Sequence, residues 1–252
     1  MHLILTGATG LCGSAVLDAM VRMKDVTKIS IISRRPVKMA EDFNDPRINV
    51  ILHKDFEKYD SELLGQLKGA KGCVWALGIS QNVVSKEEYV KITKDFALRA
   101  AESFATLGTE EEPFNFVYVS GHGSTFTPGR FTQYFAKIKG ETEILLGEMN
   151  KTHKTLYPSS IRPCFIDYAS HSAIKPYIPK QEPYKSVLEP LLGPPIRYVA
   201  KSYWSPTQPL GKFLTEMAMG KWNKSFEGPG IIKLGNFPVV ENSGFRRLAE
   251  LD

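Results

Sequence analysis

Short apolar runs alternate with stretches of helical periodicity through the first 165 residues of the chain. The apolar runs predict strands at residues 3–5, 29–33, 49–52, 72–77, 114–120 and 155–161. Apolar residues spaced three and four apart predict helices that end near residue 24 and that span about 61–67, 85–107 and 131–149. Because strands that alternate with helices are typical of a covered parallel sheet, the pattern predicts an α/β fold.

The chain changes character after Arg162-Pro163. Six prolines stand between residues 176 and 195, and such a segment can be neither a continuous helix nor a central strand. We therefore expect residues 165–205 to form an irregular Pro-rich substrate loop or small lobe within one domain that spans residues 1–252. Helical patterns return near residues 209–219 and 242–251.

The first strand runs directly into Gly7-x-x-Gly10-x-x-Gly13, and a helical pattern follows at once. This order is the context that a dinucleotide-binding fingerprint requires. Gly7 permits the tight turn, Gly10 lets the backbone approach a pyrophosphate, and Gly13 lets the helix pack closely on the strand. The first helix turn would face the phosphates with its free N–H groups. The predicted fold is thus a doubly wound Rossmann-type parallel sheet with a small C-terminal substrate lobe. The loop residues expected at the cofactor also include Thr9, Leu11 and Cys12.

The second strand ends in Ser33-Arg34-Arg35. Sites that prefer NAD place an acidic residue about 20 residues beyond the glycines to hold the ribose hydroxyls. Two arginines stand there instead, and a guanidinium suits a ribose 2′-phosphate. The sequence therefore favours NADP(H) as the cofactor, although both arginines could also be solvated surface charges.

Two later strand ends complete the predicted cofactor site. Asp55 and Phe56 follow the third strand, where they could flank the adenine, with Asp55 accepting from its amino group. Ala76, Leu77 and Gly78 end the fourth strand, where backbone would run beside the ribose and pyrophosphate. A glycine at a strand end is also compatible with an ordinary turn.

Further short motifs follow in the order in which one protein family has them. They are Thr6-Gly-Ala-Thr-Gly-Leu-Cys-Gly13, Ser33-Arg34-Arg35, Ala76-Leu77-Gly78, Val119-Ser120-Gly121, Lys139-Gly140-Glu141 and Arg162-Pro163. On these residues the chain resembles atypical short-chain dehydrogenases/reductases, above all the Tat-interacting-protein-like branch and related fungal Rossmann proteins. The resemblance covers about residues 1–165 and implies an NADP-dependent oxidoreductase, with Pro163 at the cofactor.

The resemblance also implies a catalytic Ser, Tyr and Lys, with Tyr and Lys four residues apart on one helix. Ser120 matches the serine, and Lys139 matches the lysine that would lower the tyrosine pKa and hold the nicotinamide ribose. The residue four before Lys139 is Phe135, which has no proton to donate. Tyr134 is one helical step away and pairs better with Lys137. A shifted site that uses Tyr134 and a pocket-lining role for Tyr134 both remain open.

His122 lies just past the fifth strand, in Ser120-Gly-His-Gly-Ser124. Ligands of open α/β sheets bind at that edge, and imidazole titrates near neutrality, so His122 could replace the tyrosine as proton donor. A solvated loop histidine is the equal alternative. Aromatic residues crowd the region after the sheet, where they would line an apolar substrate pocket or fill a small core.

Composition narrows the remaining classes. The net charge of +5 comes from scattered Lys and Arg, which does not indicate nucleic-acid binding. The three cysteines are far apart and give no metal spacing, and no apolar run approaches the ~18 residues of a membrane span. Since the first strand begins at His2, we expect no signal peptide and a cytoplasmic location. The family resemblance implies a monomer or a homodimer.

Three functions are compatible with these patterns. The first is an NADPH-dependent reductase of an apolar or aromatic carbonyl substrate. The second is a non-redox isomerase or cyclase on the same fold. The third is a non-catalytic regulatory protein that senses NADPH. Phe135 favours the last two without affecting the cofactor motif.

Overall fold

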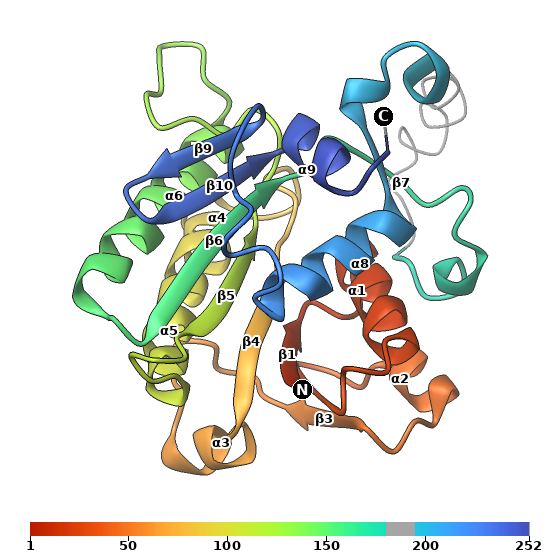
Figure 1. Cartoon of the computed structure of the whole chain (residues 1–252), viewed down its shortest axis with the longest axis vertical. Helices are drawn as coiled ribbons and strands as arrows, with labels where there is room; N and C mark the ends of the chain where they lie inside the picture. The colour runs from red at the N-terminus through yellow and green to blue at the C-terminus, as the bar shows by residue number, and fades with distance from the viewer. Residues whose placement is uncertain (180–194, 252) are drawn as a thin grey trace.

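The computed structural model describes residues 1–179 and 195–251. Within them, one eight-stranded sheet runs through the molecule in the order β3-β2-β1-β4-β5-β6-β10-β9 (Figure 1). Its strands are β1 (His2–Thr6), β2 (Lys28–Ser33), β3 (Ile48–Leu52), β4 (Ala70–Trp75), β5 (Phe114–Val119), β6 (Leu156–Arg162), β9 (Ile231–Leu234) and β10 (Phe237–Glu241). Neighbouring strands pair in parallel except β9, which is antiparallel to β10. The prediction of a doubly wound parallel sheet is confirmed.

Successive strand residues point to opposite faces, which gives the sheet two cores. Leu3 and Leu5 face one core and Ile4 faces the other, and all three are fully buried. The first core is covered by α1 (Leu11–Arg22), α2 (Lys38–Phe43), α8 (Thr207–Ala218) and α9 (Asn242–Leu248). The second is covered by α3 (Ser61–Gln66), α5 (Phe96–Phe104) and α6 (Tyr134–Thr152).

The predicted helix at 85–107 is helical but not uniform. It consists of α4 (Lys86–Val90), a π-helical turn η1 (Lys91–Asp95), α5 and a 3₁₀ turn η2 (Ala105–Leu107). The Ser85 hydroxyl accepts a hydrogen bond from the Glu88 N–H at 3.1 Å and caps the helix. In the π turn the Thr93 carbonyl accepts a hydrogen bond from the Tyr118 hydroxyl at 3.1 Å, which ties the helix to β5.

The hairpin of β9 and β10 was not predicted, and it extends the sheet beyond β6. Gly235 occupies the left-handed region at φ +61° in the turn between the two strands. Val239 and Val240 of β10 pair in parallel with Ser160 and Ile161 of β6, so the chain returns to the sheet after α8.

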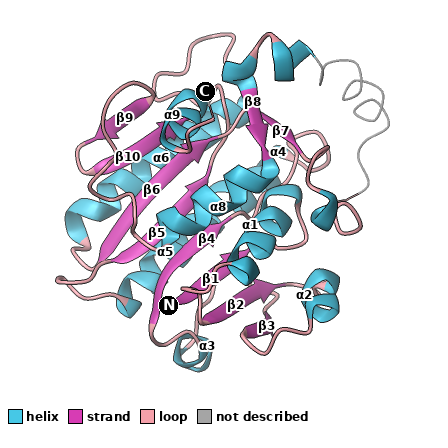
Figure 2. Ribbon diagram, turned by 45° about the vertical axis from the view of Figure 1, so that its right-hand side comes forward, coloured by secondary structure: helices cyan, strands magenta, loops and turns pink. Residues whose placement is uncertain are grey.

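A second, two-stranded parallel sheet lies at one end of the molecule, beside the main sheet (Figure 2). It pairs β7 (Phe165–Asp167) with β8 (Trp204–Pro206), and the 3₁₀ turns η3 (Ser172–Ile174) and η4 (Lys201–Tyr203) flank it. The expected irregular segment 165–205 therefore includes some regular structure, and three of its six prolines lie in residues 180–194, outside the described residues. In the part of the chain that the structure describes, no helix is both long enough and apolar enough to cross a membrane.

Candidate functional site at the carboxyl edge of the sheet

The glycine loop joins β1 to α1 with close backbone contacts that only glycine allows. Gly7 has φ +70°, and a Cβ there would lie 2.3 Å from the Ala76 carbonyl oxygen at the end of β4. A Cβ on Gly13 would lie 2.0 Å from the Gly7 carbonyl oxygen. Gly10 is the N-cap of α1 and has no side chain to bond the free N–H groups of the first turn. These groups thus remain available for an anion.

A cavity of about 350 Å³ opens beside this loop. It brings together the loop, the end of β2, and residues that follow β3 and β4. Its lining consists of Gly7, Thr9, Ile32, Ser33, Arg34, Arg35, Phe56 and Leu77. All of these except Ile32 were predicted as cofactor residues, so the cavity matches the predicted site in position.

The two arginines at the end of β2 are exposed on the rim of this cavity. Arg35 Nη2 donates a hydrogen bond to the Thr9 hydroxyl at 3.3 Å, which holds it over the glycine loop. Among residues 1–179 and 195–251, no acidic side chain forms an ion pair with Arg34 or Arg35. Their guanidinium groups are therefore free to meet an anionic ligand.

Asp55 and Phe56 differ in exposure, although they are neighbours in the chain. The Phe56 ring is buried, stacks on Phe96 at 5.8 Å between ring centroids and meets Trp75 edge-on at 6.0 Å. It thus forms a wall of the cavity from within the second core. The Asp55 carboxylate is half exposed and lies 3.8 Å from Lys58 Nζ, so it is accessible beside the cavity.

Ser120 and Lys139 meet at the end of β5. Lys139 Nζ donates hydrogen bonds to the carbonyl oxygens of Ser120 at 2.8 Å and Val119 at 3.1 Å. Burial lowers the pKa of the Lys139 ammonium to about 8, although Cys12 and Glu143 raise it. Burial also raises the pKa of the Cys12 thiol to about 11, against the opposing charge of Lys139. The ammonium is therefore placed between the glycine loop and the serine.

The hydroxyl of Ser120 is buried and lies 3.1 Å from the Ser124 hydroxyl, which donates to the Gly121 carbonyl at 2.8 Å. The loop of residues 120–124 packs closely on α6, since a Cβ on Gly140 would lie 1.9 Å from the Thr125 carbonyl oxygen. This contact explains why glycine follows Lys139 and sets the distance of the lysine from the loop.

Phe135 stands at the first turn of α6, one turn before Lys139. Its N–H donates to the Gln81 side-chain oxygen at 2.7 Å, and its Cζ lies 3.9 Å from the position of a Cβ on Gly123. Cζ is the atom to which a tyrosine hydroxyl would be attached, so Phe135 presents a bare ring edge to the 120–124 loop.

Tyr134 faces α4 instead. Its hydroxyl donates to the Lys86 carbonyl at 3.4 Å, and its ring lies 5.9 Å from the ring of Tyr89. These contacts hold the Tyr134 hydroxyl at the start of α4, where it already has an acceptor.

His122 is exposed on the loop, and its N–H donates to the Pro163 carbonyl at 2.9 Å. This bond joins two residues that the sequence placed separately at the site. The His122 ring meets the Tyr203 ring edge-on, with centroids 5.5 Å apart at 87°. Sequence reasoning named Tyr203 only among aromatic residues after the sheet, because nothing local indicates that its segment returns to His122.

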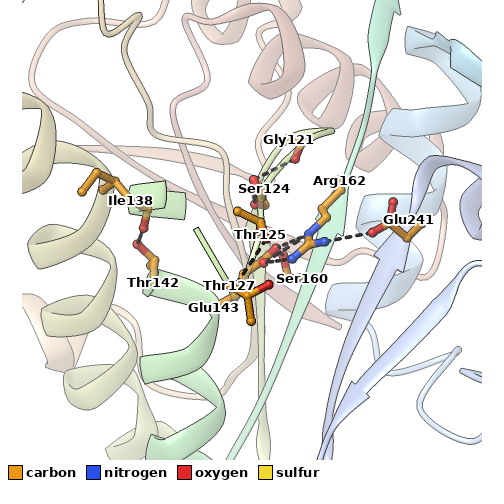
Figure 3. Close-up of polar contacts among 11 residues, drawn as sticks. Gly121, Ser124, Thr125, Thr127, Ile138, Thr142, Glu143, Ser160, Arg162 and Glu241 are labelled. Carbon is orange, nitrogen blue, oxygen red and sulfur yellow. Dashed lines mark hydrogen bonds and ion pairs between the residues drawn. The ribbon is translucent and has the colours of Figure 1, made fainter. Parts of the chain in front are cut away.

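A buried network of ion pairs and hydrogen bonds connects the helix and strands that carry the site (Figure 3). The Glu143 carboxylate, fully buried on α6, accepts hydrogen bonds from Arg162 Nη2 at 2.5 Å and from the Ser160 hydroxyl at 2.7 Å. Arg162 Nη1 donates to Glu241 at 2.9 Å, and its guanidinium stacks 4.6 Å from the Phe126 ring centroid. The network joins α6, β6 and β10, and its glutamates were missed because they become partners only through the sheet topology.

The sheet order and the glycine loop between β1 and α1 define a Rossmann-type fold, and the cavity lies where proteins of this fold bind dinucleotides. No family model matches the chain. The chain is 34% identical over 238 residues to leucinostatins biosynthesis cluster protein T of Purpureocillium lilacinum, which covers 87% of this chain and 85% of that protein. It is 40% identical over 156 residues to botcinic acid biosynthesis cluster B protein 16 of Botryotinia fuckeliana, which covers 62% of this chain and 99% of that protein.

Among solved structures, a short-chain type dehydrogenase/reductase from Mycobacterium ulcerans superposes with a TM-score of 0.63 at 15% identity, over 97% of this chain and 89% of that chain. The chain belongs to one family with leucinostatins biosynthesis cluster protein T. It has the fold of short-chain dehydrogenases/reductases, so the fold that the resemblance implied is confirmed.

Proposed function

We propose that this protein binds NADP(H) and reduces the carbonyl group of an apolar or aromatic small molecule. The observation on which the proposal mainly rests is the cavity beside the glycine loop, with Arg34 and Arg35 on its rim and no acidic partner for either among residues 1–179 and 195–251. A site for NAD would place a carboxylate at the end of β2, where this chain has two cations.

The residues present fit this cofactor. A side chain on Gly7 or Gly13 would collide with neighbouring backbone, so these glycines permit the close-packed loop, and the first turn of α1 would offer its N–H groups to the pyrophosphate. Arg34, assisted by Arg35, would bind the 2′-phosphate. Lys139 is within the same edge of the sheet and would bind the nicotinamide ribose in place of its present carbonyl partners.

The bound cofactor would supply a hydride to the substrate carbonyl carbon. The hydroxyl of Ser120 would donate a hydrogen bond to the carbonyl oxygen and polarise it. His122 is a candidate for the proton donor because it is exposed at the same edge and an imidazole can carry a transferable proton. Tyr134 is the weaker candidate because its hydroxyl bonds to Lys86, and a water bound with the substrate is the third source.

The substrate would bind beside the 120–124 loop, under the described parts of segment 165–205. β7 and β8 fasten that segment to the domain, and Tyr203 brings an aromatic ring to His122. This arrangement supports an apolar or aromatic substrate, since a flat ring can pack on aromatic side chains.

Phe135 favours a second candidate function. Without a tyrosine hydroxyl four residues before Lys139, the fold could serve a non-redox isomerase or cyclase, or a regulatory protein that responds to NADPH. In either case cofactor binding would persist, because the glycine cradle and the arginines do not depend on residue 135.

Incubation of the protein with NADPH and a panel of aromatic ketones tests the proposal. Ketone-dependent loss of absorbance from NADPH, with an alcohol as product, is the expected result. Tight NADPH binding without turnover on any ketone, together with reductase activity gained by Phe135→Tyr, would instead identify a lapsed active site.

A further inference from the structure

We propose that Tyr203, on the segment that precedes β8, is the proton donor in the reduction, in place of the hydroxyl that Phe135 lacks. The inference rests on the proposed reductase function and names one further catalytic residue for it. It follows from the contact between the Tyr203 and His122 rings, from which tyrosine hydroxyls of this region have a hydrogen-bond partner, and from the hydrogen bonds that hold the backbone around Tyr203.

Phe135 and Tyr203 both contact the loop of residues 120–124. Phe135 Cζ lies beside Gly123, and the Tyr203 ring lies against His122, the preceding residue of the same loop. Consecutive Cα atoms are about 3.8 Å apart. The side chain that the Tyr203 ring contacts and the backbone that the Phe135 ring edge faces thus belong to consecutive residues of one loop.

The tyrosine hydroxyls of this region differ in whether they already have a hydrogen-bond partner. Tyr118 and Tyr134 donate theirs to the carbonyl oxygens of Thr93 and Lys86. Within residues 1–179 and 195–251, the Tyr203 hydroxyl has no hydrogen-bond partner, and the side chain is 48% exposed. It is thus free to donate to a substrate and to recover a proton from water.

Hydrogen bonds hold the segment around Tyr203 in place. Asp167 on β7 accepts hydrogen bonds from Arg197 Nε at 2.5 Å, Arg197 Nη2 at 2.8 Å and Trp204 Nε1 at 2.9 Å. Asn242 Nδ2 donates to the Ser202 carbonyl at 2.6 Å on the other side of Tyr203. Burial raises the pKa of the Asp167 carboxyl, but the bonds from Arg197, Ala169 and Trp204 lower it below its usual range, so this clamp stays ionised at neutral pH.

The clamp fixes the backbone on both sides of a half-exposed ring, which is the arrangement that an oriented proton donor needs. In the proposed step the carbonyl carbon would take a hydride from the nicotinamide of bound NADPH, leaving NADP⁺, as the C=O π bond breaks. The carbonyl oxygen takes the proton of the Tyr203 hydroxyl, giving the alcohol. The tyrosinate then regains a proton from solvent, with the His122 ring packed against it.

The test compares Tyr203→Phe with Tyr198→Phe. Tyr198 lies on the same segment, is 78% exposed and makes no hydrogen bond in the described residues, so its variant is the matched control. Both changes remove one unengaged hydroxyl, so both proteins should fold and bind NADPH as the wild type does. With an aromatic ketone that the wild type reduces, Tyr203→Phe should lower kcat about 10²- to 10⁴-fold and Tyr198→Phe should not change it.

A second readout does not depend on turnover. In protein labelled with ¹³C at tyrosine Cζ, the resonance absent from Tyr203→Phe is assigned to Tyr203. Addition of the ketone should shift this resonance, because its hydroxyl gains an acceptor, and should leave that of Tyr198 in place.

Activity of Tyr203→Phe within about threefold of the wild type, or a Tyr203 resonance that does not respond to ketone, would overturn the assignment while the reductase function stands. A wild-type protein that binds NADPH but reduces no ketone would remove the reductase function, and the proton donor with it.

Discussion

Removal of the Arg34 guanidinium should weaken NADPH binding and leave NADH binding almost unchanged. Arg34 is exposed on the cavity rim at the end of β2 and has no ion-pair partner in the described residues, so Arg34→Ala costs no internal contact. A hydrogen bond to a charged group contributes about 1.5–3 kcal/mol. At 1.4 kcal/mol for each factor of ten, the dissociation constant for NADPH should rise roughly 10- to 100-fold.

Calorimetric titration of the wild type and Arg34→Ala with each nucleotide, at low and at moderate salt, measures this difference. Arg99→Ala is the control, because Arg99 is an exposed arginine on α5 that pairs with Glu102 at 3.0 Å. Since salt screens exposed charges, the effect should shrink as the ionic strength rises. An equal loss of NADPH and NADH affinity would refute the assignment of Arg34 to the 2′-phosphate.

Three further predictions concern the cradle, the buried network and the lysine. Gly13→Ala should abolish nucleotide binding in calorimetry, because its Cβ would lie 2.0 Å from the Gly7 carbonyl oxygen; normal affinity would contradict the geometry. Glu143→Gln should lower the free energy of unfolding in urea by about 3–5 kcal/mol, since it breaks a buried ion pair, whereas the exposed Glu148→Gln should change it little; equal effects would be evidence against the network. The pKa of Lys139 falls on folding from 10.5 to about 8, so the unfolded state binds more protons between these values. The stability of the wild type relative to Lys139→Met should therefore rise as the pH increases through this range, and a flat difference would argue against a buried ammonium.

The part of the fold that the sequence predicts best is the part whose signal is local. Strand, glycine loop and helix follow one another within the first 22 residues, and each glycine has a steric reason that the structure shows directly. The alternation of strands and helices up to β6 likewise follows from apolar periodicity, because both faces of the sheet are buried.

The hairpin of β9 and β10 was missed although a local signal exists. Gly235-Asn236 separates two short apolar runs, which is a two-residue hairpin pattern. A proline within a short run weakens a strand signal, and Pro238 stands inside the second run. Only the pairing of β10 with β6 shows that this region completes the sheet.

The residues of the candidate site likewise divide into those that the local sequence predicts and those that depend on tertiary packing. Arg34 and the glycines could be placed from spacing, because they belong to consecutive elements at one edge. The contact of Tyr203 with His122 and the pairing of Glu143 with Arg162 could not, because sequence separations of 81 and 19 residues are closed only by tertiary packing. Tyr134 illustrates the limit within one helix, since its orientation depends on the contact of α6 with α4.

The central claim is that the glycine cradle binds a phosphorylated nicotinamide nucleotide, and a calorimetric and thermal titration of the wild-type protein with NADPH tests it most directly. The account predicts a saturable heat with one site per chain, and at 100 times the dissociation constant a stabilisation of about 2.7 kcal/mol that raises Tm. No heat and no rise in Tm with NADPH, NADP⁺ or NADH would contradict it.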